Sequence, residues 1–127
     1  MKLEISTNEL KKRQDDFCQK HAENSIDVNG FLVTSEGLVF CQKTYTYHCR
    51  LPKQHLAIIY KMKTTPRKVF TRQELLDIGW IDRSSERLEA NVVMAISNIR
   101  LQFGNGCIIT VRGLGYMSNM HNTCSSR

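Results

Sequence analysis

The stretch Asn91–Met117, NVVMAISNIRLQFGNGCIITVRGLGYM, decides the fold of this chain. Its first half carries apolar residues at helical spacing, which predicts an amphipathic helix that ends at Gly104-Asn105-Gly106. An apolar strand follows over Cys107–Val111, and Gly113-Leu114-Gly115 turns the chain back. The stretch therefore predicts a helix followed at once by a tight β-hairpin with one arginine at its tip.

The predicted helix spans about residues 85–103, with Ser84 or Ser85 as its N-terminal cap. Its core-facing stripe consists of Leu88, Val92, Ile96, Ile99 and Phe103. The outward side is expected to carry Asn91, Met94, Ala95, Asn98 and Gln102, with Arg87 one turn earlier. These outward residues are mostly small or able to form hydrogen bonds, and the segment from Val92 to Ile99 contains no charge.

In the segments before this helix, the spacing of apolar residues changes along the chain from that of strands to that of helices. Three short runs rich in β-branched and aromatic residues predict an antiparallel meander over 31–33, 38–41 and 44–49. Leu51-Pro52 opens a helix over 52–63, because proline fits a first turn where its missing N–H costs nothing. Thr71 and Glu74 form the capping-box pattern of a second helix, which Gly79 ends before Trp80, an expected core anchor.

The ends of the chain differ from this central part. Ser6-Thr7-Asn8-Glu9 has a capping-box pattern and predicts a helix from about Thr7 to Ala22 with a thin apolar stripe. This helix is either a loosely docked arm or a dimerisation or partner helix. The predicted division is a helical arm over 1–29, a folded domain over 30–118 and a flexible tail over 119–127.

The order of these elements predicts the fold class. A β-meander, three helices and a C-terminal hairpin form an α+β winged helix-turn-helix, in which the hairpin is the wing, over about residues 107–117.

The charge of the chain favours an anionic partner. Its 127 residues carry a formal net charge of +6, which points to nucleic acid before an anionic membrane, although a generic basic surface is the alternative. No acid lies between Glu36 and Glu74, and the basic residues from Cys41 to Thr71 are Lys43, Arg50, Lys53, Lys61, Lys63, Arg67 and Lys68.

The side chains of the helix suit the edges of DNA bases. Asparagine can pair with adenine, and alanine can contact a thymine methyl group in the major groove. Arg112 at the hairpin tip would then contact a phosphate or the minor groove. The predicted partner is double-stranded DNA, with a homodimer partner or a second regulator beside it. Alternatively, the uncharged face packs on a protein, and the chain modulates another regulator without specific DNA binding of its own.

Other classes of function find no support in the sequence. The sequence contains no P-loop, no nucleophile-and-base motif and no paired carboxylates. Neither an enzyme nor a cofactor is therefore expected. The five cysteines include no CxxC pair, which argues against a metal site and fits free thiols in a reducing cytosol. Because no apolar run could span a membrane and no signal peptide opens the chain, a cytoplasmic location is expected. No small-molecule ligand is indicated.

Three motifs together resemble a known family. Phe70–Trp80 (FTRQELLDIGW) is similar to T/S-R-x-x-L-L-x-x-x-W, Ala95–Arg100 (AISNIR) to A-I-S-x-L-R, and Thr110–Tyr116 (TVRGLGY) to T-V-R-G-x-G-Y. In this order and spacing they resemble the C-terminal winged-helix DNA-binding domain of OmpR/PhoB-type regulators, closest to the ToxR/CadC branch. The resemblance covers about residues 30–118.

The resemblance implies a four-stranded N-terminal sheet, three helices, a hairpin wing and transcriptional regulation through tandem or inverted promoter elements. It implies base-facing positions at Asn91, Ala95 and Asn98, to which the predicted helix face adds Met94. The positions that it implies near the DNA backbone are Thr71, Arg72, Trp80, Ser97, Arg100 and Tyr116, and Arg87 is added from the helix itself. Arg112 belongs to the wing.

The chain also departs from the family pattern. His55 stands where the first helix usually has a glutamate, and the recognition helix is poor in arginine and lysine, so a weak phosphate grip is expected from it. The leading residues are too few for a receiver domain, and no transmembrane segment follows the domain. Regulation is therefore expected to come from abundance, a partner, the N-terminal helix or a cysteine.

Overall fold

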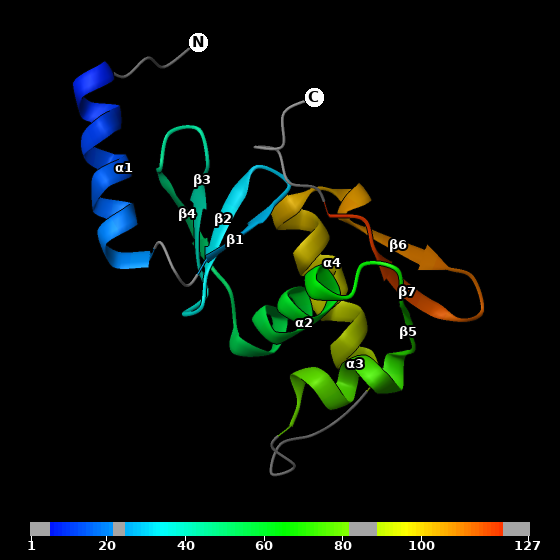
Figure 1. The fold of residues 1–127 in the computed structure, drawn as a ribbon. Coiled ribbons are helices and arrows are strands. Elements are labelled where there is room, and N and C mark those ends of the chain that lie inside the picture. Colours follow the sequence, from blue (N-terminus) through cyan, green and yellow to red (C-terminus); the bar gives the residue numbers. More distant parts are fainter. Residues whose placement is uncertain (1–5, 22–24, 82–88, 121–127) are drawn as a thin grey trace.

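Two small antiparallel sheets flank three helices in this computed structural model, which describes residues 6–21, 25–81 and 89–120 (Figure 1). The elements in chain order are α1 (Thr7–His21), β1 (Ser25–Val28), β2 (Phe31–Thr34), β3 (Leu38–Cys41), β4 (Tyr47–Arg50), α2 (Lys53–Thr64), β5 (Val69–Phe70), α3 (Arg72–Gly79), α4 (Glu89–Phe103), the 3-10 turn η2 (Asn105–Cys107), β6 (Ile108–Val111) and β7 (Gly115–Ser118). The α+β winged helix-turn-helix predicted from the sequence is confirmed.

The N-terminal sheet has four strands in the order β1-β2-β3-β4. Strand β1 begins at Ser25, earlier than the first strand predicted from the sequence, and pairs with β2 in antiparallel register. Asn29 and Gly30, with φ of 50° and 90°, form the turn between them, as a two-residue hairpin loop requires. The four residues of β1 have mixed polarity, and their pattern is too short to predict a strand. The Asn-Gly turn, in contrast, could be predicted from the sequence.

Helix α3 begins as its sequence predicts. The backbone N–H of Glu74 donates to Thr71 Oγ1 at 3.1 Å, and the N–H of Thr71 donates to Glu74 Oε1 at 2.9 Å. This reciprocal pair satisfies two backbone donors that a helix start would otherwise leave unpaired. Lys68 Nζ lies 3.2 Å from the other Glu74 oxygen, and these contacts keep the pKa of the Glu74 carboxyl below its usual value. The cap fixes the direction in which α3 leaves the second sheet.

One hydrophobic core joins the helices to both sheets. Its largest fully buried side chains are Phe70, Ile58, Ile59, Met62, Leu75, Ile96, Ile99, Ile108, Val28, Val33, Val39 and Val92. Trp80 also belongs to this core, with 9% of its surface exposed, and is confirmed as a core anchor. Four of the five residues predicted for the inner stripe of α4 are buried, and the fifth, Leu88, lies outside the described residues.

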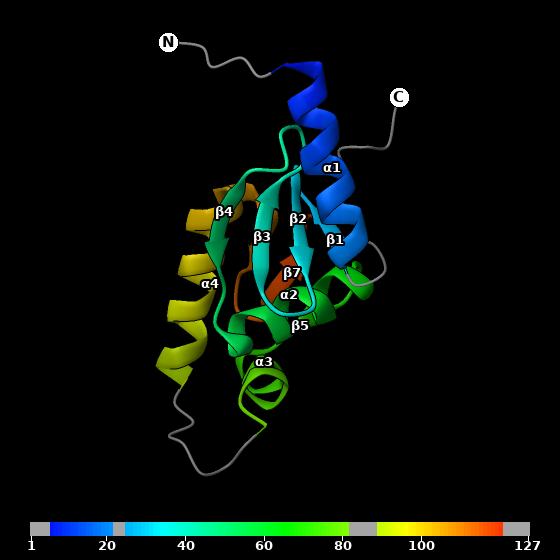
Figure 2. The same cartoon turned by 90° about the vertical axis from the view of Figure 1, so that its left-hand side faces the viewer.

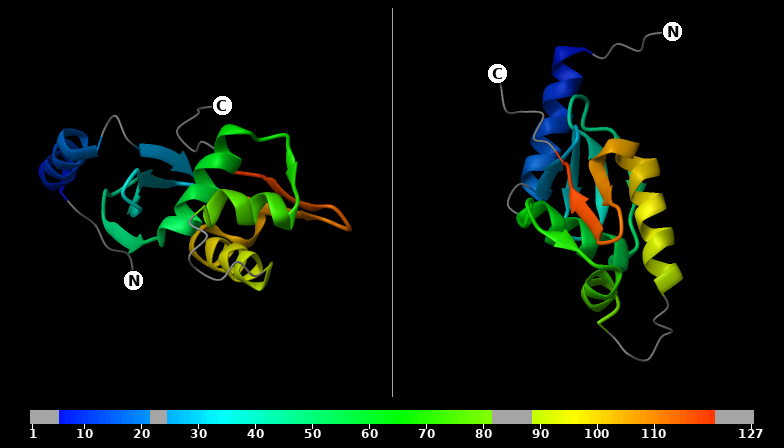
Figure 3. Two further views of the ribbon diagram at one scale, coloured as in Figure 1. Left: turned by 90° about the horizontal axis from the view of Figure 1, so that it is seen from below. Right: turned by 90° about the vertical axis from the view of Figure 1, so that its right-hand side faces the viewer.

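The second sheet carries the wing. Its strand order is β5-β7-β6, so β7 lies in the middle and the β6–β7 hairpin projects beyond the helices (Figures 1 and 3). Phe70 of β5 pairs with Tyr116 of β7. After β7, the N–H of Asn119 donates to the carbonyl of Cys107 at 2.8 Å, and Met120 packs against the core. The predicted flexible tail thus starts with two anchored residues, and residues 121–127 lie outside the described part.

Helix α1 packs on the side of the first sheet away from α2–α4 (Figures 1 and 2). Its buried residue Phe17 contacts the rings of Phe40 and Tyr45, with centroids 5.1 and 5.6 Å apart. Arg13 donates to the carbonyl of Thr44 and to the hydroxyl of Thr46, each at 3.3 Å. The predicted helix is present, and Phe17, Arg13 and His21 attach it to the first sheet. No helix in the described ranges is both long and apolar enough to cross a bilayer.

Candidate nucleic-acid interface

Helix α4 lies at the edge of the molecule with one flank uncovered by the other described elements (Figures 2 and 3). Its inner face is buried through Val92, Ala95, Ile96, Ile99 and Phe103. The residues of its outer face are Glu89, Ala90, Val93, Met94, Ser97 and Leu101, all of which are exposed. Two of them are large apolar side chains with most of their surface free, Met94 at 70% and Leu101 at 78%.

The outer face is rotated relative to the sequence prediction. Met94 and Ser97 point outward as expected, but Ala95 is 0% exposed and lies in the core. Ala95 therefore cannot meet a base, and its predicted base-facing role is corrected. At about 100° per residue, the side opposite the buried stripe holds Ala90 and Leu101 rather than Ala95. A helical wheel drawn from the sequence could therefore have placed Ala95 on the buried side.

The asparagine predicted as a base reader lies on the flank of α4 that faces α2. Asn98 Nδ2 lies 3.0 Å from His55 Nδ1, and Gln102 Nε2 donates to Asn98 Oδ1 at 3.4 Å. Asn98, Gln102 and Asn91 are all partly buried. The Asn98 amide is thus held by neighbours on both of its ends, and His55, noted in the sequence only as a departure, is one of them.

His55 should make stability fall at acid pH. Burial lowers the pKa of its imidazole from the usual 6.5, so the unfolded chain takes up a proton more readily than the folded one. The stabilisation is complete above about pH 6.5 and is lost as the pH falls toward the lower folded-state pKa. We expect the urea midpoint of the wild type to drop more between about pH 7 and pH 5 than that of His55→Gln. Parallel curves for the two proteins would contradict this.

Arg100 connects α4 to the wing. Its Nη2 donates to the Ile108 carbonyl at 2.8 Å and to Thr110 Oγ1 at 2.8 Å, and its Nε donates to the same carbonyl at 3.2 Å. The guanidinium carbon also lies 5.9 Å from the centroid of the Tyr116 ring. Arg100 is the only cation in Glu89–Phe103, so α4 presents no unengaged positive charge outward. The weak phosphate grip expected of this helix fits that arrangement.

The start of α3 and the wing line a shared hollow of about 380 Å³. Thr71, Arg72 and Gln73 line it from α3, and residues of the wing line it from the other side. Arg72 Nη1 lies 3.9 Å from Glu89 Oε1, a long contact between two exposed side chains that leaves the guanidinium accessible. At the tip of the wing, Arg112 is exposed in a turn where the N–H of Leu114 donates to the Val111 carbonyl at 2.9 Å.

Two of the residues predicted near the DNA backbone are buried instead. Trp80 and Tyr116 are 9% and 7% exposed, and both pack in the core, which leaves them little surface for a contact with DNA. Arg87 lies outside the described residues. The backbone positions that remain at the surface are Thr71, Arg72 and Ser97.

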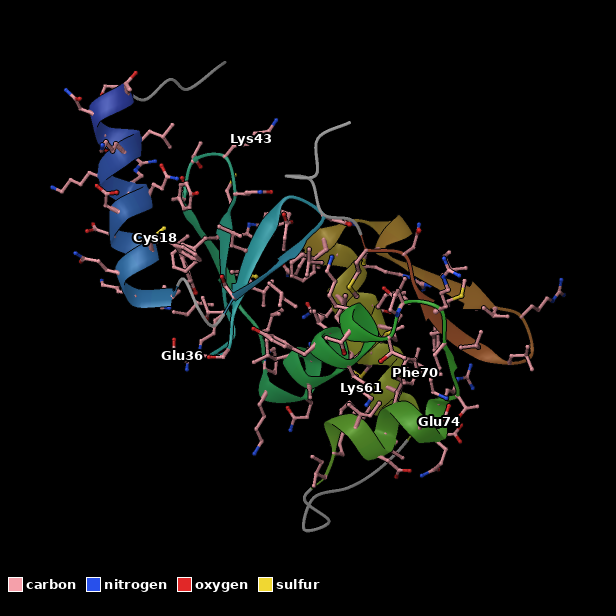
Figure 4. The ribbon with its side chains drawn as sticks, in the orientation of Figure 1. Cys18, Glu36, Lys43, Lys61, Phe70 and Glu74 are labelled. Carbon is pink, nitrogen blue, oxygen red and sulfur yellow. The ribbon has the colours of Figure 1, made fainter. Side chains whose placement is uncertain are left out.

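Two basic residues of the interval between Glu36 and Glu74 lie at opposite ends of the molecule. Lys43 lies at the turn between β3 and β4, whereas Glu74 of α3 lies at the other end of the molecule (Figure 4). Lys68 is paired with Glu74. Lys43 and Lys68 of this interval therefore do not share one face.

The cysteines are free thiols where the structure describes them. These are Cys18, Cys41, Cys49 and Cys107. Burial raises the pKa of Cys107 to about 11, so this thiol stays protonated at neutral pH. Among the described residues, no group of three or more His, Cys, Asp or Glu side chains could hold a metal ion.

Comparison with known proteins agrees with this geometry. The family described as "Transcriptional regulatory protein, C terminal" matches residues 47–118. The crystal structure of the DNA-binding domain of the response regulator AdeR, in complex with an intercistronic region, is 28% identical, covers 70% of this chain and 93% of its own, and has a TM-score of 0.55. The C-terminal domain of the nisin resistance regulator NsrR is 26% identical with 70% and 90% coverage and a TM-score of 0.55.

The DNA-binding domain of CadC from E. coli shares the fold, with 22% identity, coverage of 75% of this chain and 91% of that one, and a TM-score of 0.62. No curated protein matches the sequence of this chain. The family match covers more than half of the chain and includes α2, α3, α4 and the wing. The chain therefore belongs to the family of transcriptional regulatory proteins with an OmpR/PhoB-type winged-helix DNA-binding domain.

Proposed function

We propose that this protein is a sequence-specific DNA-binding transcriptional regulator that acts in the cytoplasm. One observation carries the proposal: the uncovered flank of α4 and the exposed wing tip belong to two elements that Arg100 holds together. A helix of this size fits the major groove, and a projecting hairpin can reach the adjacent backbone or minor groove. Residues 25–118 would form the DNA-binding unit, preceded by α1 as an attached helix.

The proposed contacts follow from exposure. Met94 and Ser97 on the outer face of α4 would meet base edges and the groove wall, with Asn91 and Asn98 at the flank of that face. Thr71 and Arg72 at the start of α3 would approach a phosphate, and Arg112 would do so from the wing. Phosphate contacts fix the position of the protein on the duplex, while base contacts give the sequence preference.

The proposal is tested by selecting bound duplexes from a random pool and then footprinting the enriched sequence on genomic fragments. A regulator of this kind enriches one motif, and the spacing of protected half-sites reports whether one copy or two bind. Recovery of no motif above the background of non-specific binding would overturn the proposal.

Arg112→Ala should weaken binding to all sequences alike. If the Arg112 guanidinium contacts a phosphate, its loss lowers the slope of log affinity against log salt by about one, with the preferred motif unchanged. The measurement is a fluorescence-anisotropy titration at several salt concentrations, on the selected site and on an unrelated duplex. Lys43→Ala, at the far turn of the first sheet, is the matched control and should leave the slope unchanged. Equal slopes for wild type and Arg112→Ala would contradict the wing contact.

A second candidate is a protein-interaction module that modulates another regulator without specific DNA binding of its own. The exposed apolar side chains of α4 favour it, because such surface often marks a protein interface. Co-purification with another regulator, together with DNA affinity that Arg112→Ala does not change, would support this candidate over the first.

A further inference from the structure

We propose that α4 reads DNA mainly through thymine methyl groups, contacted by a stripe formed by Ala90, Val93, Met94 and Ser97. The inference rests on the proposed function and specifies its ligand: a duplex with thymines on the face of the major groove that α4 enters. This mode of base recognition can be tested without knowing the target genes.

The stripe follows from the helix geometry. Residues at i, i+3, i+4 and i+7 share one face of a helix, and all four side chains are exposed. Val93 and Met94 keep 40% and 70% of their surface free. The recognition helix of a helix-turn-helix presents its N-terminal part to the bases, and the stripe occupies the first two turns of α4 and the start of the third.

The polar side chains of α4 are engaged elsewhere. Arg100 donates to Ile108 and Thr110 of the wing, so it is not directed at guanine. The Asn98 amide is held between His55 and Gln102 on the partly buried flank. The side chains that remain at the centre of the outer face are methyl, methylene and thioether groups with one hydroxyl.

The chemistry of the groove then selects the ligand. Among the four bases, thymine alone presents a methyl group in the major groove, and apolar side chains recognise that methyl by contact. A cytosine at the same position would place an amino group against Val93 or Met94, where no acceptor side chain of the stripe other than Ser97 can meet it. The stripe therefore favours thymine, whose methyl group it contacts, and disfavours cytosine, whose amino group would lack an acceptor.

The experiment uses the full chain and the motif obtained by selection. Each thymine of the motif is replaced in turn by deoxyuridine, which removes only the methyl group. We expect a loss of about fourfold in affinity for each methyl buried against the stripe. Met94→Ser should abolish the deoxyuridine effect at one or two positions, so that thymine and uracil duplexes bind this variant equally.

Matched controls separate a direct contact from other effects. Ile81→Ser removes an apolar side chain of similar exposure two residues after α3, and it should keep the full thymine preference. Urea denaturation confirms that both exposed-site variants fold. If removal of a methyl weakened wild type and Met94→Ser equally, the methyl would act through the shape of the DNA, and the proposed contact would be overturned.

The outcomes also distinguish this inference from the function on which it rests. A motif that is selected but insensitive to deoxyuridine at every position overturns the methyl readout and leaves the regulator intact. Selection of no motif at all overturns both.

Discussion

Gly115→Ala should lose about 4 kcal/mol or more of the free energy of unfolding, the largest effect expected from a single methyl group in this chain. A Cβ at this position would lie 1.9 Å from the carbonyl oxygen of Phe70 and 3.0 Å from the Cα of Thr71, both backbone atoms. Phe70 of β5 pairs with Tyr116, the residue after Gly115, so the backbones are held together here and the contact cannot be relieved by turning a side chain. The strands have to separate, and the wing loses its support.

Gly113→Ala is the matched control for this prediction. Its φ of 79° is also one that alanine adopts with strain, but no atom lies within 4 Å of the added Cβ. It should cost about 1–2 kcal/mol, the strain of a left-handed residue alone. Urea denaturation of the two variants measures the difference. Equal midpoints would show that β7 does not approach the backbone of Phe70 as closely as described.

Arg100→Ala should lower the free energy of unfolding by about 1–3 kcal/mol and abolish tight DNA binding. The guanidinium donates twice to the carbonyl of Ile108, a residue with 1% of its surface exposed, and once to Thr110. Its removal leaves that carbonyl with fewer partners and frees the wing from α4. Because the two elements are expected to contact one duplex together, their relative position matters for affinity.

The test of Arg100 distinguishes a structural role from the phosphate contact that the family resemblance implies. Arg100→Lys should recover little, because an ammonium cannot reproduce the fork of donors. Thr110→Val removes one of the three hydrogen bonds and should cost less than Arg100→Ala. Unchanged stability, together with a salt slope lower by about one, would instead assign Arg100 to a phosphate. Hydrogen exchange of the wing amides gives an independent measure of its anchoring.

Much of the fold could be predicted because its signals are local. The capping box of Thr71 and Glu74, the stop at Gly79 and the turn at Asn29-Gly30 each depend on residues within four positions of one another. The residue pattern missed strand β1, which only the family resemblance implied, because β1 is stabilised by its partner β2 rather than by a pattern of its own. The start of α4 at Ser84 or Ser85 remains a prediction, since it falls outside the described residues.

The candidate site was predicted less well than the fold. The motifs located the helix and the wing correctly, and Met94, Ser97 and Arg112 are exposed as expected. Ala95 was placed on the wrong side. The prediction relied on the small size of alanine, and a small side chain fits a base edge and a tightly packed core equally well.

By itself, the sequence determined the order of the helices and the wing, the cap of α3, the turn at Asn29-Gly30, and the apolar stripe that marks a recognition helix. Only the tertiary structure decided how α4 is rotated and which side chains are free. That rotation depends on the packing of α4 against α2 and α3, which precede it in the chain, and against η2, which directly follows it. The contact of Asn98 with His55 arises in the same way, because it joins residues 43 positions apart. Arg100 and Ile108 are eight positions apart, and they meet because the chain folds back on α4 after η2.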